Sequence, residues 1–134
     1  MIVRLPASLS RGSVVEAKYA LPRDCPRCKG GARGTVIGHG RRQRNCLSES
    51  ESEIRVRRGL CRTCGGTITF LPSFLGAYRR YTFPIIESVL QQRHQGRDYG
   101  SLLVHLHDSE RYPETSTVRR WCKEFARAPT MPAF

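Results

Sequence analysis

The middle of the chain carries short segments in which apolar and polar positions alternate. Within Ile54–Arg58, Ile and Val alternate with Arg, which predicts a strand with one buried face and one cationic face. Thr35–His39 and Thr67–Leu71 are rich in β-branched residues and have the length of strands. The pattern therefore predicts three short antiparallel strands.

Between the first two predicted strands the sequence becomes polar. Arg41–Arg44 is followed by Ser48–Glu53, a run of alternating Ser and Glu that cannot bury itself and predicts a mobile loop. Leu71–Tyr81, after the third strand, is too aromatic for a free linker. We expect this connector to pack one module against the next.

Beyond the connector, the spacing of apolar residues becomes helical. One helix is predicted to start near Pro84 and to end before Gly96, and a second to run from about Ser101 to Asp108. A third is predicted to start at a hydroxyl cap, Thr115 or Ser116. Its apolar residues recur at i, i+3, i+4 and i+7: Val118, Trp121, Cys122 and Phe125. This spacing predicts that Trp121, the single tryptophan, is a core residue.

The change of composition near Thr82–Pro84 predicts a module boundary. We expect an arm or edge strand over residues 1–22, a zinc ribbon with its aromatic connector over 23–82, and a helical module over 83–134. The predicted fold class is α+β, a four-cysteine zinc ribbon of short antiparallel strands followed by a three-helix tail resembling a helix-turn-helix.

Composition narrows the function classes. The 134 residues include 23 Arg and Lys against 11 Asp and Glu, a net charge of +12, so a polyanion is the natural partner. Biased genomic base composition is an alternative reason for the excess of Arg, but it leaves the sign of the charge unchanged. No apolar run is long enough to span a membrane, and the N-terminus lacks a leader pattern, so we expect a cytoplasmic, nucleoid-associated protein.

Four of the six cysteines form two C-x2-C pairs, Cys25 with Cys28 and Cys61 with Cys64. Glycines follow each pair closely, as in the tight turns that aim two thiolates at one ion. We predict one Zn²⁺ per chain, with the predicted loop accounting for the 32-residue gap between the pairs. Four thiolates leave no open position, so the metal would be structural; a redox C-x2-C or chance pairing is the alternative.

Two basic sets are candidate DNA contacts. On the third predicted helix, the polar face could enter a groove or be an ordinary solvated face; its residues are Thr115, Ser116, Arg119, Arg120, Lys123 and Arg127. The second set is expected to contact phosphates: Arg41, Arg42, Arg44, Arg55, Arg57, Arg58, Arg79 and Arg80.

The order of these motifs resembles a known family. The two cysteine pairs enclose Arg-rich strands, and Leu71-Pro-Ser-Phe-Leu75, Tyr78-Arg-Arg-Tyr81 and Ser116-Thr-Val-Arg-Arg-Trp121 follow. Over residues 23–127 the chain resembles short bacterial zinc-ribbon proteins with helix-turn-helix tails, similar to the DNA-binding parts of insertion-sequence transposases. The resemblance implies double-stranded DNA at transposon ends or a promoter as the partner, and a role as transposition accessory factor or regulator.

The same sequence features allow functions other than DNA binding. The ribbon and connector could instead serve as a protein–protein adaptor, and a separate transposase or a second copy of the chain are further candidate partners. We expect no enzyme, no small-molecule substrate and no membrane partner, because the sequence contains three Asp and no nucleophile–base motif. Cys46 is either a reactive thiol or without a role, and Cys122 fits as a small apolar residue.

Overall fold

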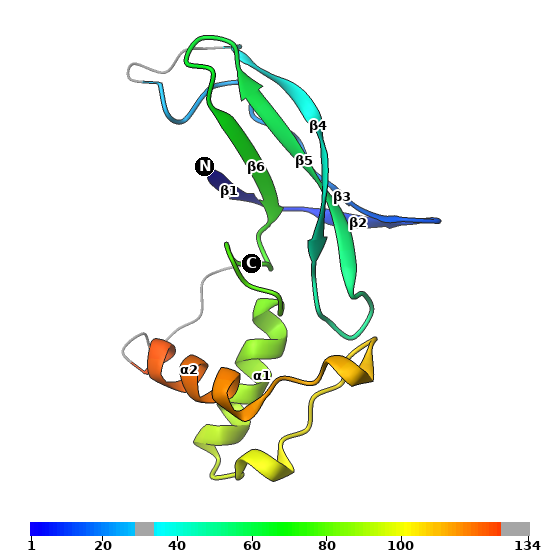
Figure 1. Cartoon of the computed structure of the whole chain (residues 1–134), viewed down its shortest axis with the longest axis vertical. Coiled ribbons are helices and arrows are strands. Elements are labelled where there is room, and N and C mark those ends of the chain that lie inside the picture. Colours follow the sequence, from blue (N-terminus) through cyan, green and yellow to red (C-terminus); the bar gives the residue numbers. More distant parts are fainter. Residues whose placement is uncertain (29–33, 127–134) are drawn as a thin grey trace. The chain divides into compact units, whose positions relative to one another are not determined.

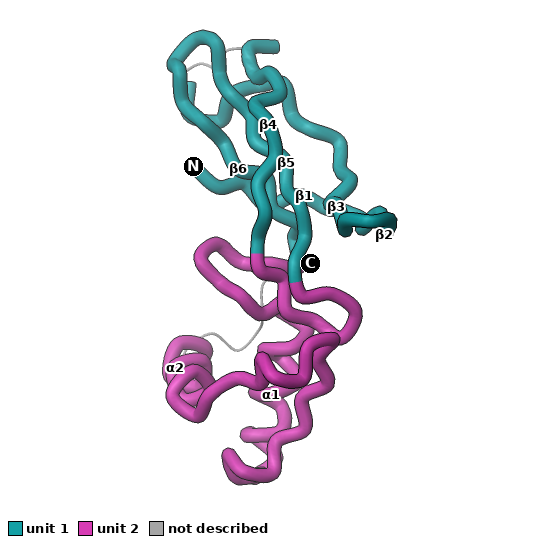
Figure 2. The backbone as a smooth tube through the Cα atoms, turned by 45° about the vertical axis from the view of Figure 1, so that its right-hand side comes forward, with its two compact units in different colours: residues 1–44, 53–73 teal, residues 45–52, 74–134 magenta. Residues whose placement is uncertain are grey.

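The computed structural model describes residues 1–28 and 34–126 (Figure 1). The chain divides into two compact units, shown in teal and magenta in Figure 2. Unit 1 comprises residues 1–44 and 53–73, and unit 2 comprises residues 45–52 and 74–134. Within the described residues no helix has the length and apolar character that a membrane span requires.

The described residues of unit 1 form a curled, mixed sheet of six strands. The strands are β1 (Ile2–Leu5), β2 (Ser8–Arg11), β3 (Val15–Lys18), β4 (Val36–Asn45), β5 (Glu53–Cys61) and β6 (Thr67–Pro72). Their order is β1-β6-β5-β3-β2, and β4 also pairs with β5. The β5–β6 and β2–β3 pairs are antiparallel, whereas β1–β6 and β3–β5 are parallel.

The predicted fold class, a zinc ribbon followed by a three-helix tail, is wrong. The three expected strands exist as β4, β5 and β6, but residues 1–22 add β1, β2 and β3 to the same sheet. β1 pairs in parallel with β6, with Val3 opposite Phe70, and Thr69 N donates to Met1 O over 2.9 Å. These three strands have four residues each, too few for a period to stand out in sequence.

The core of unit 1 includes one cysteine of each pair, Cys25 and Cys61. Val36, Ile68 and Phe70 are buried there, and the hydroxyl of Tyr19 joins two strands by donating to Phe70 O and accepting from Arg57 N, each over 2.8 Å. Gly59 on β5 leaves room for this packing, because a Cβ there would lie 2.9 Å from the Phe70 ring. The core thus depends on a missing side chain as well as on the apolar ones.

The described part of unit 2 contains two α-helices, α1 (Phe83–His94) and α2 (Thr115–Phe125). Two short 3₁₀ turns lie between them, η1 (Tyr99–Ser101) and η2 (Ser109–Arg111). The first and third predicted helices are confirmed, and the core that joins them consists of Phe83, Ile86, Val89, Leu102, Val118 and Trp121. Trp121 packs edge-on against Tyr81, with ring centroids 5.2 Å apart.

The second predicted helix, Ser101 to Asp108, does not form, so the helix-turn-helix prediction is wrong. In the described chain, residues 102–106 are neither helix nor strand. Gln92 on α1 satisfies the backbone of Leu103, because its Nε2 donates to Leu103 O and its Oε1 accepts from Leu103 N, both over 2.7 Å. The predicted hydroxyl cap of α2 is also wrong, since Glu114 is the N-cap and makes no side-chain capping bond.

The Ser-Glu run, which the sequence predicts as a mobile loop, forms a hydrogen-bonded turn in unit 2. Ser48 Oγ accepts from Glu51 N over 3.1 Å and donates to Glu51 Oε2 over 2.8 Å. Glu51 is only 6% exposed, and Cys46 N donates to Ser52 O over 2.9 Å. The alternation of Ser and Glu therefore supplies local partners for a compact turn.

Candidate metal centre and basic surfaces

Each cysteine pair lies in a turn of unit 1. Cys25 and Cys28 precede β4, whereas Cys61 ends β5 and Cys64 lies in the turn to β6. That turn is tight, because Gly65 N donates to Cys61 O over 2.8 Å and Cys61 N donates to Gly66 O over 3.0 Å. Gly65 has φ +71°, a conformation that glycine adopts without strain. The local sequence thus shapes the turn that presents both sulfurs.

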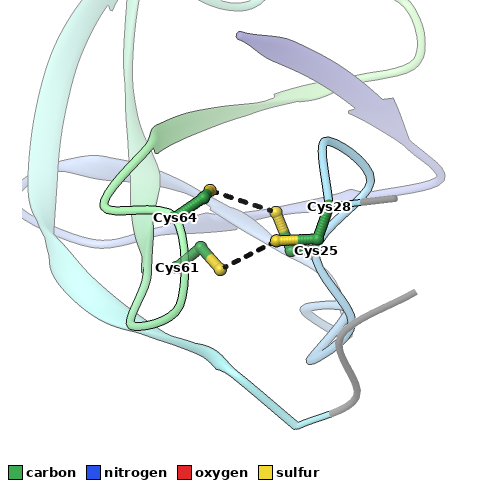
Figure 3. A group of neighbouring side chains, drawn as sticks. All are labelled: Cys25, Cys28, Cys61 and Cys64. Atoms are coloured by element: carbon green, nitrogen blue, oxygen red, sulfur yellow. Dashed lines mark hydrogen bonds between the residues drawn. The ribbon is translucent and has the colours of Figure 1, made fainter. Parts of the chain in front are cut away.

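The four sulfurs converge on one point (Figure 3). Sγ of Cys25 lies 3.8 Å from Sγ of Cys64, Sγ of Cys28 lies 3.7 Å from Sγ of Cys61, and all four atoms lie within 4.8 Å of one another. A tetrahedral zinc–thiolate site with bonds of about 2.3 Å has sulfur–sulfur edges of about 3.8 Å, whereas a disulfide would bring two sulfurs to about 2.05 Å. The four cysteines can therefore hold a metal ion.

A short segment connects the two turns. Val36 N donates to Arg23 O and Arg62 N donates to Thr35 O, each over 2.9 Å, so residues 35 and 36 bond to the chain beside both pairs. Asp24 Oδ1 also accepts from Gly34 N over 3.0 Å. These bonds link the chain segments that carry the two halves of the cluster.

Thr35 also contacts the cluster directly, a role that the sequence analysis missed. Its Oγ1 lies 3.2 Å from Sγ of Cys61, and this hydrogen bond lowers the pKa of Cys61 to about 6. Burial raises the pKa of the Cys28 thiol, and its neighbouring thiols raise it further. A divalent ion would remove this conflict, because it stabilises all four thiolates together.

Positive charge is concentrated in unit 1. Its sequence contains fourteen Arg and Lys against three Asp and Glu, whereas unit 2 contains nine against eight. On β4, every residue from Ile37 to Gln43 is exposed, including Arg41 and Arg42. The remaining predicted phosphate contacts of this unit are half-buried: Arg44, Arg55, Arg57 and Arg58.

Glu16 on β3 is a second residue that the sequence analysis missed. Its carboxylate lies 3.2 Å from Arg41 Nε, 3.7 Å from Arg55 Nη1 and 3.3 Å from Lys18 Nζ. The hydrogen bond from Lys18, with help from the two arginines, lowers the pKa of Glu16. One acidic side chain thus holds cations from three strands together, and no local motif could have indicated it.

The predicted DNA contacts of unit 2 are divided among different neighbours. Thr115, Ser116 and Lys123 are exposed on α2, and the Arg119 guanidinium lies 5.2 Å from the centre of the Tyr99 ring. Arg79 is bound to Glu124, with Nη1 3.1 Å from Oε2, and lies over the Phe125 ring. Arg80 and Arg120 border one hollow. Arg127 lies outside the described residues.

The two remaining cysteines do not join the cluster. Cys46 is fully buried, and Cys122 is partly buried against the core of unit 2, as its predicted apolar role requires. Burial away from solvent disfavours a reactive thiol at Cys46.

Comparison with known proteins gives one match. A family model described as a domain of unknown function, DUF6431, matches residues 25–121 and so includes both cysteine pairs and most of α2. No curated protein and no solved structure matches the chain.

Proposed function

The chain belongs to the DUF6431 family, and from that premise we propose that it is a DNA-binding protein whose unit 1 is held together by one Zn²⁺. The observation that carries this proposal is the unequal distribution of charge. Unit 1 holds fourteen Arg and Lys against three acidic residues, next to a four-thiol cluster. A bound divalent ion with four thiolates would subtract two charges and leave the unit strongly positive.

Zinc is the ion that best fits the donor set. Four sulfurs at tetrahedral separations suit Zn²⁺, and Cys25, Cys28, Cys61 and Cys64 would fill every position around it. When bound, the ion supplies cross-linking and charge neutralisation of the thiolates, because no position remains for a substrate or water. The protein's own residues, above all Thr35, hold the sulfurs in place.

DNA is the polyanion that the surface of unit 1 fits. Arg41 and Arg42 are both exposed on β4, and Arg55 and Arg57 lie on the neighbouring strand β5. Guanidinium groups on adjacent strands can pair with successive phosphates of a duplex, which gives affinity without base recognition. The resemblance to insertion-sequence proteins further suggests a transposition accessory factor or a regulator of a mobile element.

The proposal is tested by measuring duplex affinity as a function of salt. Arg42→Gln should weaken binding to unrelated duplexes alike and lower the slope of log K against log salt by about one unit, because one phosphate contact is lost. Arg97→Gln is the matched control, since Arg97 is also exposed but lies in unit 2, where its Nη1 donates to Ser101 O over 3.4 Å.

Two results would contradict the proposal. One is the absence of duplex binding by the wild-type protein at low salt. The other is an equal loss of affinity for Arg42→Gln and Arg97→Gln, which would mean that only net charge matters. An adaptor that binds another protein through apolar contacts would instead show weak dependence on salt.

A further inference from the structure

A hollow of about 870 Å³ lies entirely within unit 2. The loop Ala77–Tyr81 forms one wall, and residues 110–114 form another. The floor comes from α2, through Thr117, Arg120 and Trp121. We call it the Tyr78 hollow, after the residue at its rim.

Tyr78 is held in an unfavourable state. Its φ is +61°, and among the described non-glycine residues it alone has a positive φ. It follows Gly76 and Ala77 in a turn closed by Arg79 N donating to Gly76 O over 3.3 Å, at the position where Gly or Asn is preferred. Its side chain is 91% exposed. Strain of this kind persists where it serves a function, and here it holds an aromatic ring out into solvent.

The charged groups of the hollow are not all neutralised. Arg79 is bound by Glu124, but in the described part of the chain Arg80 and Arg120 form no ion pair. Arg111 adds a third cation, and Glu110 and Glu114 add two carboxylates. The hollow therefore offers donors for an anion, acceptors for amino groups and aromatic faces.

We propose that the Tyr78 hollow binds a nucleotide. Its base stacks on Tyr78, its phosphate pairs with Arg80 and Arg120, and the carboxylates of Glu110 and Glu114 accept hydrogen bonds from the base's exocyclic amino group. The ligand is either a free mononucleotide or an unpaired nucleotide of a single strand. This inference does not rest on the DNA-binding proposal, because every residue of the hollow belongs to unit 2.

The test uses the full chain and three probes: adenosine 5′-monophosphate, adenosine, and a single-stranded oligonucleotide of eight adenylates. Binding of the monophosphate above adenosine is expected from the phosphate contact. Binding of the oligonucleotide well above the monophosphate would identify a strand as the source, and equal binding would identify the free nucleotide. Absence of binding of both phosphate-bearing probes would overturn the proposal.

Variants separate stacking from charge. Tyr78→Gly should weaken binding of the bound probe about 5- to 150-fold while raising the melting temperature by a few degrees, because glycine relieves the positive φ. Tyr78→Phe should keep the affinity, since it keeps the ring. A Tyr78→Gly protein that melts higher and binds as well as wild type would overturn the role of Tyr78.

Arg119 and Arg120 form a matched pair on α2. Arg120 borders the hollow, whereas Arg119 lies over Tyr99 outside it. Arg120→Gln should weaken phosphate-bearing probes at least 5-fold and Arg119→Gln should not. Equal weakening by both would overturn the phosphate assignment. Variants at Tyr78 and Arg42 keep this test distinct from that of unit 1, because Tyr78 lies in unit 2 and Arg42 in unit 1.

Discussion

Removal of one thiolate should release the metal ion and unfold unit 1. In Cys61→Ser the oxygen replaces a sulfur that lies 3.7 Å from Sγ of Cys28 and accepts a bond from Thr35. Three soft ligands hold Zn²⁺ far less tightly than four. We expect zinc content to fall from one ion per chain to a small fraction.

The free energy lost with the ion can be compared with the total free energy of unfolding of unit 1. The ion would cross-link turns separated by 32 residues, and closing a loop of this length is worth about 4 kcal/mol in the chain-entropy model for a cross-link. Domains of this size have total stabilities of about 5–15 kcal/mol, so this term alone is a large part of the whole. Unit 1 without metal should therefore be partly or wholly unfolded at room temperature.

The single tryptophan gives an assay that separates the units. Trp121 is buried in the core of unit 2, so its fluorescence reports on that unit, whereas hydrogen exchange of β5 and β6 reports on unit 1. A chelator or Cys61→Ser should abolish amide protection in the strands and leave the Trp121 emission nearly unchanged.

Cys122→Ser is the control, because Cys122 is partly buried outside the cluster, and it should keep its metal. Full zinc content in Cys61→Ser would refute the ligand assignment. Unchanged strand protection after chelation would refute the structural role of the ion.

Two further predictions concern packing and charge. Gly59→Ala should destabilise unit 1 by about 1–3 kcal/mol in thermal unfolding, because the new Cβ would lie 2.9 Å from the Phe70 ring. The control is Gly12→Ala, at an exposed position with open space around it. Equal destabilisation by both substitutions would contradict the reasoning. Glu124→Gln should remove a pH-dependent contribution to unit 2. The hydrogen bond from Arg79 lowers the pKa of Glu124 below its ordinary 4.5, so the stabilisation is complete above that pH and is lost as the pH falls through the lowered pKa. The Glu124 side chain is 42% exposed, so the loss of stability should be below about 1 kcal/mol. Glu87→Gln is the control. An identical acid-unfolding profile in wild type and Glu124→Gln would contradict the prediction.

Local patterns explain which parts of the structure were predictable. The strands flanking the second cysteine pair, the two α-helices and each C-x2-C pair have signals within a few residues of one another. The parallel pairing of β1 with β6 has none, because its partners lie more than sixty residues apart and β1 has four residues. The leucines of 101–108 have helical spacing, but the contact of Gln92 with Leu103 outweighs it.

Functional residues, like the secondary structure, were predictable where their signal is local in sequence. Cysteine spacing indicates a ligand set directly, whereas Thr35 and Glu16 act through partners on other strands. The strain at Tyr78 is likewise invisible in sequence, because a tyrosine between two turn residues and two arginines also fits a strand or a helix. Backbone conformation has to be known before that residue draws notice.

The segment between β4 and β5 connects the two units along the chain. Residues 45–52 leave unit 1 after β4, take part in unit 2 and return to begin β5. Within unit 2, Leu47 is buried and pairs with Tyr81, and Ser48 O accepts from His107 N over 2.8 Å. A fragment that begins after residue 82 would therefore lack Leu47, a buried residue of unit 2. Neither unit of this chain can therefore be produced as a single continuous fragment, because residues 45–52 of unit 2 lie between the two segments of unit 1.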